Sequence, residues 1–150
     1  MDISKLINNE TVFIGLDVKS KEECINTMIN GMEKAGFVTD KAAYLEAVNI
    51  REKTGSTGVG FEVAIPHGKS GGVAAPGLAF ARLSSPVDWN SLDGKPVSIV
   101  FMIGVPEKDT SNEHLKILIA ISRKLVHEDF RKQLMDVKSS EDVLRILESI

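Results

Sequence analysis

The sequence predicts an α/β domain in which one mixed β-sheet of about four to five strands has helices on both of its sides. Segments with apolar residues at helical spacing alternate with short runs of β-branched and aromatic residues, which is typical of layered α/β proteins. No linker, repeat or low-complexity tract divides the 150 residues, so residues 1–150 are expected to form one domain. The net charge of −3 argues against a nucleic-acid-binding protein, which usually carries a basic face.

The first third of the chain is predicted to be mainly helical. The expected elements are a short helix at 2–9, a strand at 11–16, a helix at 20–35 and a helix from 39 or 40 to about 53. Ser20 and Glu23 have the spacing of a capping box, and Gly36 is a typical residue for ending that helix. Cys24 lies on its apolar stripe, which is expected to face a core.

The rest of the chain is predicted to supply most strands and three closing helices. The expected elements are strands at 63–65, 77–83 and 97–103, and helices at 112–126, 128–137 and 140–149. The strand at 97–103 is apolar nearly throughout, which is typical of a central strand buried on both faces. Residues 84–95 are rich in turn formers and are expected to form a loop. Ser139 and Asp142 indicate a helix cap. The pattern leaves the strand order open.

His67 is the first candidate for chemistry. Proline fixes its own φ and restricts the preceding residue, so the strand at 63–65 is expected to stop at Pro66 and to present His67 at its end. Gly68 leaves room for a group to approach the ring. A neutral histidine carries a lone pair on one nitrogen, so His67 is a possible nucleophile, although a lone histidine is more often a structural residue.

The run from Gly55 to Gly60, G-S-T-G-V-G, invites comparison with nucleotide-binding loops but fits none of them. A P-loop needs Lys and then Ser or Thr after its second glycine, whereas Phe61 and Glu62 follow Gly60. The dinucleotide fingerprint needs a glycine where Val63 stands. A plain turn would explain one or two of the glycines. We expect instead a loop whose amides and hydroxyls surround a phosphoryl group, and the candidates for this binding are Ser56, Thr57, Gly58 and Gly68.

Arg51 and His114 are candidates for supporting roles. Arg51 falls in the last turn of its helix, where any cation gains from the helix dipole, but a guanidinium can also hold two phosphoryl oxygens at once. His114 opens the helix at 112–126 and shares a face with Leu118 and Ile121, so it could be a packed structural residue. A helix N-terminus, however, attracts anions and keeps a nearby imidazole neutral.

Neither a metal nor a cofactor is expected. The three histidines are not at the spacings of metal ligands, and Cys24 belongs to a core stripe. A single cysteine fits a reducing cytosol, and the most apolar run, 97–105, is far shorter than the roughly 20 residues that a membrane helix needs. We therefore expect a cytoplasmic protein without direct membrane insertion.

Two motifs in the chain resemble a known family. Residues 51–68 have the order R-E-x-x-x-S-T-G-x-G-x-x-x-A-I-P-H-G, and the segment at His114 begins H-L and continues as an apolar helix. This resembles the enzyme IIA domains, fructose/mannitol type, of the bacterial phosphoenolpyruvate-dependent sugar phosphotransferase system. The resemblance implies a phosphotransferase in which His67 accepts a phosphoryl group from HPr and passes it to an enzyme IIB partner during sugar uptake.

The resemblance also implies roles for the other candidates and leaves alternatives open. Arg51 and the glycine loop would hold the phosphoryl oxygens, His114 would support the phosphorylated ring, and no ATP or metal would be required. A nitrogen-regulatory branch of the same family keeps the phosphorylatable histidine but acts by binding regulators. A third possibility is a binding domain in which His67 is unreactive.

Overall fold

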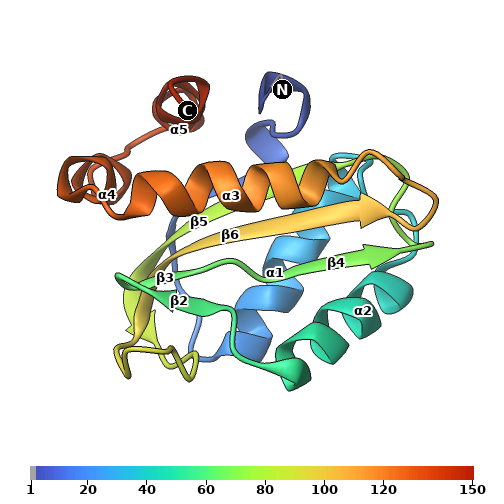
Figure 1. Ribbon diagram of the computed structural model, residues 1–150, viewed down its shortest axis with the longest axis horizontal. Helices are drawn as coiled ribbons and strands as arrows, with labels where there is room; N and C mark the ends of the chain where they lie inside the picture. Colours follow the sequence, from blue (N-terminus) through green and yellow to red (C-terminus); the bar gives the residue numbers. More distant parts are fainter. Residues whose placement is uncertain (1–2) are drawn as a thin grey trace.

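Six strands form one mixed sheet in the computed structural model, which describes residues 3–150 except for the side chains of residues 113 and 114. The strands are β1 (Val12–Leu16), β2 (Gly58–Gly60), β3 (Val63–Ala64), β4 (His67–Ser70), β5 (Gly77–Val87) and β6 (Val97–Pro106). Their order is β1-β5-β6-β3-β2, and β4 pairs with β6 beyond the end of β3 (Figure 1). The prediction of a mixed sheet is confirmed, with one or two strands more than expected.

Five α-helices accompany the sheet in the described residues. They are α1 (Lys21–Lys34), α2 (Lys41–Thr54), α3 (Glu113–Leu125), α4 (Glu128–Met135) and α5 (Ser140–Glu148). The side chains of Ser20, Asp40 and Ser139 accept the hydrogen bonds that begin α1, α2 and α5. None of these helices has the length and apolar character that crossing a bilayer would demand.

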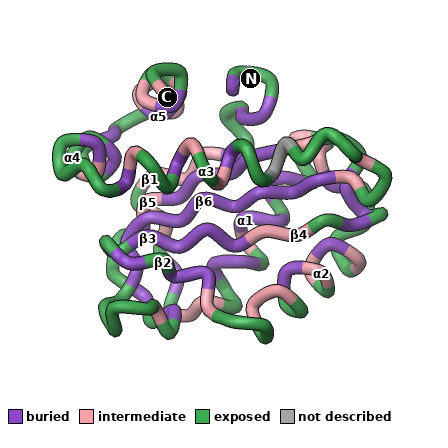
Figure 2. The backbone as a smooth tube through the Cα atoms, viewed as in Figure 1, coloured by how far each residue is buried: buried purple, intermediate pink, exposed green. Residues whose placement is uncertain are grey.

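The two faces of the sheet are covered by different helices (Figure 1). On one face α1 and α2 pack Met28, Met32 and Tyr44 against alternate residues of β5 and β6. On the other face α3, α4 and α5 pack Ile117, Ile121 and other apolar side chains against the remaining strand residues. Figure 2 shows the central strand β6 buried along nearly its whole length, with exposed residues on the outer sides of the helices. The prediction of helices on both sides is therefore confirmed.

The strand prediction around His67 was incomplete. The strand at 63–65 does end before Pro66, but the chain then continues along the same neighbour, with His67 opposite Ile103 and Ser70 opposite Pro106. His67 therefore opens strand β4 instead of terminating a strand. Pairing with the long strand β6 imposes this extended geometry, since the sequence H-G-K-S has little strand propensity of its own.

Two further local predictions need correction. Residues 3–11 hold two short 3-10 helices, Ile3–Lys5 and Asn9–Thr11, in place of one helix, and residue 2 lies outside the described part. Strand β5 continues to Val87, through residues expected to form a loop. The register between β5 and β6 shifts between Arg82 and Val87, so Pro86 sits in the irregular stretch, where its missing N–H is tolerated.

Candidate functional site

His67 lies half-buried at the first position of β4, and its ring is oriented by the backbone. The Nδ1 atom is 2.9 Å from the carbonyl oxygen of Ile65. A carbonyl oxygen only accepts hydrogen bonds, so this contact requires a proton on Nδ1. In the neutral ring the lone pair then resides on Nε2. The backbone two residues upstream thus selects one tautomer of His67.

Helix α2 approaches β4 closely beside His67. A Cβ atom at Gly68 would lie only 3.2 Å from Ala47 Cβ and 3.2 Å from Val48 N. The Tyr44 hydroxyl, also on α2, donates a 2.7 Å hydrogen bond to the carbonyl oxygen of Ile103, the strand residue paired with His67. Burial raises the pKa of this phenol, so it remains a donor. A side chain at Gly68 would therefore crowd α2, whether or not Gly68 also admits a phosphoryl group.

The end of β4 is tied to the loop that leads into α3. Lys69 Nζ donates a 2.6 Å hydrogen bond to the carbonyl oxygen of Asp109, and the Glu107 amide donates to Ser70 O at 3.1 Å. Helix α3 then begins at Glu113, after Asn112 in the left-handed region with φ 58°. His114 belongs to the first turn of α3, as the sequence predicts, but its side chain lies outside the described residues.

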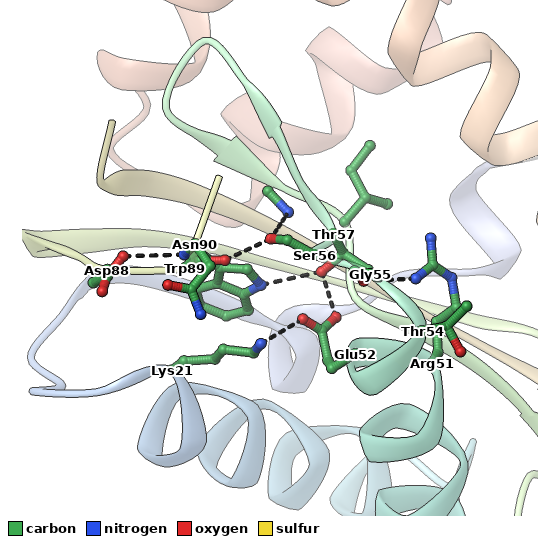
Figure 3. A network of polar contacts seen from close by, with 12 residues as sticks. Lys21, Arg51, Glu52, Thr54, Gly55, Ser56, Thr57, Asp88, Trp89 and Asn90 are labelled. Carbon is green, nitrogen blue, oxygen red and sulfur yellow. Dashed lines mark hydrogen bonds and ion pairs between the residues drawn. The ribbon is translucent and has the colours of Figure 1, made fainter. Parts of the chain in front are cut away.

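Arg51 lies in the last turn of α2, the position that the sequence predicts. Its Nη1 atom donates a 2.8 Å hydrogen bond to the carbonyl oxygen of Gly55, just past the end of the helix (Figure 3). This is the contact expected of a cation at a helix C-terminus. It uses one of the five N–H groups of the guanidinium. A grip on phosphoryl oxygens remains a prediction.

The hydroxyl groups of Ser56 and Thr57 face Trp89 and Glu52 (Figure 3). Ser56 Oγ donates to Trp89 O at 2.5 Å and accepts from Gly58 N at 3.0 Å. Thr57 Oγ1 donates to a Glu52 carboxylate oxygen and accepts from Trp89 Nε1 at 3.1 Å. A side chain at Gly58 would overlap Ser91. The predicted phosphate contacts of these three residues remain untested, but each residue has a structural role.

The sequence reasoning did not single out Lys21, Glu52 or Trp89. Lys21 Nζ forms a 2.7 Å ion pair with Glu52 Oε1, and only 18% and 6% of these two side chains are exposed. Trp89 is fully buried. Two signals could have pointed to the group: a tryptophan among turn residues needs a partner for its N–H, and Glu52 directly follows Arg51 in the motif.

Cys24 is remote from this chemistry. The residue is buried on the stripe of α1 that the sequence predicts, with its Sγ atom 3.8 Å from Met28 Sδ. Burial raises the pKa of the thiol from 9.0 to about 12, and the neighbouring Glu23 carboxylate adds to the shift. Because the thiolate is the nucleophilic form, this thiol is unreactive near neutral pH.

The chain was compared with known protein families and with individual proteins. Residues 5–150 match the family model described as "Phosphoenolpyruvate-dependent sugar phosphotransferase system, EIIA 2". The chain is 40% identical over 147 residues to the fructose-specific EIIABC component of Bacillus subtilis, covering 98% of this chain but only 23% of that protein. It is 38% identical to the fructose-specific EIIA component of Haloferax volcanii, covering 99% of this chain and 96% of the relative.

A solved structure agrees with these sequence relationships. The crystal structure of the nitrogen regulatory protein IIA-Ntr from Neisseria meningitidis is similar with a TM-score of 0.89 and 35% identity, over 97% of this chain and 98% of that one. The match of the family model extends over both the His67 segment and the start of α3. The chain therefore belongs to the EIIA 2 family of the phosphoenolpyruvate-dependent sugar phosphotransferase system.

Proposed function

We propose that this protein carries a phosphoryl group on His67, accepting it from phospho-HPr and passing it to an enzyme IIB component. The single observation that carries the proposal is the contact between His67 Nδ1 and the Ile65 carbonyl oxygen, 2.9 Å long. It leaves the lone pair of the neutral ring on Nε2, so Nε2 is the attacking atom in this proposal. Membership of a phosphoenolpyruvate-dependent phosphotransferase family supports phosphoenolpyruvate as the original source of the phosphoryl group.

The step is an in-line exchange between two protein groups. His67 Nε2 attacks the phosphorus atom, the new N–P bond forms, and the N–P bond to the donor histidine of HPr breaks with its electron pair staying on that donor. The His67 ring gains positive character as Nε2 shares its lone pair. The Ile65 carbonyl oxygen faces the Nδ1 proton and stabilises this charge. Transfer to enzyme IIB is the same exchange with His67 as the leaving group.

Positioning and charge stabilisation are the main demands of such a transfer. Arg51 is proposed to hold phosphoryl oxygens with the guanidinium N–H groups that do not bond to Gly55. His114, in the first turn of α3, is proposed to support the phosphorylated ring. The backbone amides of the glycine loop are proposed to complete the cradle.

The onward partner depends on the branch of the family. The Bacillus subtilis relative is named an EIIABC component, which joins A, B and C parts in one chain and favours an enzyme IIB acceptor for this chain as well. The likeness to a nitrogen regulatory protein favours a second candidate function, phosphorylation-dependent binding to regulators. His67 is the phosphorylated residue in both candidates, and the cytoplasm is the compartment that both imply.

Transfer from phosphoenolpyruvate labelled in its phosphate group, through enzyme I and HPr, tests the proposal. The wild-type protein is expected to take up one acid-labile phosphoryl group, and the His67→Ala variant none. His127→Ala is the matched control, because His127 is an exposed histidine at the start of α4. Undiminished labelling of the His67→Ala variant would refute the mechanism. A panel of enzyme IIB proteins as acceptors then separates the transport branch from the regulatory one.

A further inference from the structure

Lys21, Glu52, Thr57 and Trp89 form a buried polar network beside the glycine loop, and Thr57 links it to the strand that precedes His67. We propose that Glu52, Thr57 and Trp89 act as positioning residues: together they fix the loop and the His67 ring for phosphotransfer, without touching the phosphoryl group. This inference rests on the proposed function of His67. For Thr57 the motif 51–68 predicts a direct phosphate contact, and for Glu52 it predicts no role. Trp89 lies outside the motif.

The network joins segments that are far apart in the sequence (Figure 3). Lys21 comes from α1, Glu52 from the last turn of α2, Thr57 from the loop, and Trp89 from the segment between β5 and β6. Lys21 Nζ pairs with Glu52 at 2.7 Å and also lies 5.9 Å from the centre of the Trp89 ring. Glu52 in turn accepts from Thr57, which accepts from Trp89. A shift of any one segment therefore breaks a contact to another.

One backbone hydrogen bond and one contact of the His67 side chain connect this network to His67. The carbonyl oxygen of Thr57 accepts a 2.9 Å hydrogen bond from the Ile65 amide. The Ile65 carbonyl oxygen is the atom that faces His67 Nδ1 at 2.9 Å. The position of Thr57 thus sets the position of the residue that selects the His67 tautomer.

The hydroxyl groups of the loop are poorly suited to hold phosphate directly. A phosphoryl oxygen needs a hydrogen-bond donor, and a hydroxyl group has only one proton to donate. The Thr57 proton goes to Glu52 and the Ser56 proton goes to Trp89 O. Thr57 is moreover only 2% exposed. These hydroxyl groups hold the loop in place, so we assign the phosphoryl contacts to Arg51 and to backbone amides of the loop.

The test compares Thr57→Val, which keeps the shape but removes the hydroxyl group, with Thr57→Ser, which restores it. Ser98→Ala is the matched control, because Ser98 is also buried and its hydroxyl group donates to a glutamate, Glu62, at 3.2 Å. Trp89→Phe removes the N–H group that donates to Thr57, and this variant replaces Thr57→Val in the test if Thr57→Val does not fold. Rates of phosphorylation by phospho-HPr are measured well below the melting temperature of every variant.

We expect the maximal rate of the Thr57→Val variant to fall about tenfold or more, which corresponds to the loss of one buried hydrogen bond. The half-saturating concentration of phospho-HPr is expected to change less than about twofold, because the network is internal. Thr57→Ser should restore most of the rate, and Ser98→Ala should keep it. A Thr57→Val variant that is no slower than Ser98→Ala at equal loss of stability would overturn the proposal.

Nitrogen NMR of the His67 ring gives a readout that does not depend on phosphotransfer. The wild-type ring is expected to show the Nδ1–H tautomer, and the Thr57→Val ring a mixture of both tautomers. A slow variant with an unchanged tautomer would point to direct phosphate contact by Thr57 and would also overturn the proposal. If the wild-type protein accepts no phosphoryl group at all, the proposed function fails, while the tautomer comparison still decides whether the network positions the ring.

Discussion

Replacing Gly68 with alanine is expected to destabilise the protein and to slow phosphotransfer, because the added methyl group would press against α2. The φ angle of Gly68 is not among the positive ones, so the backbone itself accepts alanine without strain. The new Cβ atom would lie 3.2 Å from Ala47 Cβ, 3.2 Å from Val48 N and 3.3 Å from Val48 Cγ2, all below ordinary van der Waals contact. Backbone and Cβ atoms cannot rotate away, so the helix itself must move by a few tenths of an ångström.

The size of the effect follows from this shift. Overpacking of a closely packed contact typically costs about 1–3 kcal/mol of unfolding free energy. For a protein of this length that corresponds to a melting temperature lower by about 2–12 °C. Helix α2 also carries Arg51 and Glu52. Because a misplacement of about 1 Å can cost about 10²-fold in rate, a shift of a few tenths is expected to slow transfer about threefold to tenfold.

Urea unfolding and phosphorylation kinetics on the same purified variant measure both quantities. Gly55→Ala is the control for stability: no atom lies within 4 Å of its added Cβ, and its φ of 166° is extended backbone. This control is expected to match the wild type or to gain up to about 1 kcal/mol through the unfolded state. A Gly68→Ala variant with wild-type stability and rate would refute the packing argument. Slow transfer at wild-type stability would instead favour a role for Gly68 in admitting the phosphoryl group.

Two further predictions concern Arg51 and Cys24. Arg51→Lys is expected to fold normally but to transfer phosphate at least about tenfold more slowly, since an ammonium cannot reproduce the planar two-point grip; a wild-type rate would leave Arg51 as a helix-end cation. Cys24→Ala is expected to keep the transfer rate and to lose modest stability. Because the folded-state pKa of Cys24 is raised from 9.0 to about 12, its unfolded form alone ionises between these values, so wild-type stability should fall relative to Cys24→Ala as pH rises above 9. Equal pH slopes of the two proteins would contradict the burial of the thiol.

Helices and strands with a signal in their own residues could be predicted from the sequence. Strands that form only because a distant strand pairs with them could not. The caps at Ser20 and Ser139 act within three residues, so α1 and α5 were predicted to within about a turn. The central strand β6 was predicted from its apolar run and extends only slightly further, to Pro106. Strand β4, in contrast, forms because it pairs with β6, and the residues H-G-K-S do not by themselves predict a strand.

The candidate site divides in the same way. The motif predicts that Arg51, His67 and the glycine loop lie in one neighbourhood, and this stays a prediction. The structure shows that α2, which carries Arg51, packs closely on β4 at Gly68. It could not reveal that the Thr57 hydroxyl group is occupied by Glu52 and Trp89, because Trp89 is 32 residues away along the chain. Hydrogen-bond partners of this kind are set by tertiary packing, which periodicity and spacing do not encode.

The hairpin between β2 and β3 shows how strongly the site depends on such contacts. Its two central residues, Phe61 and Glu62, both have positive φ, 58° and 63°, a conformation that favours Asn and Gly in two-residue hairpins. The turn is stabilised from outside: the guanidinium of Arg131 lies 4.5 Å from the Phe61 ring centre, and Glu62 O accepts hydrogen bonds from the amides of Ser98 and Ile99.

These contacts matter for the site because the same hairpin orients Thr57. β2 and β3 pair from Gly58 opposite Ala64, and the next backbone bond joins Thr57 O to the Ile65 amide. A turn that relaxed to negative φ would change the hairpin twist and displace this bond. We therefore expect the tautomer of His67 to depend on the buried network at Thr57 and on the backbone and ring contacts that hold this turn, all of which the Ser98→Ala variant retains.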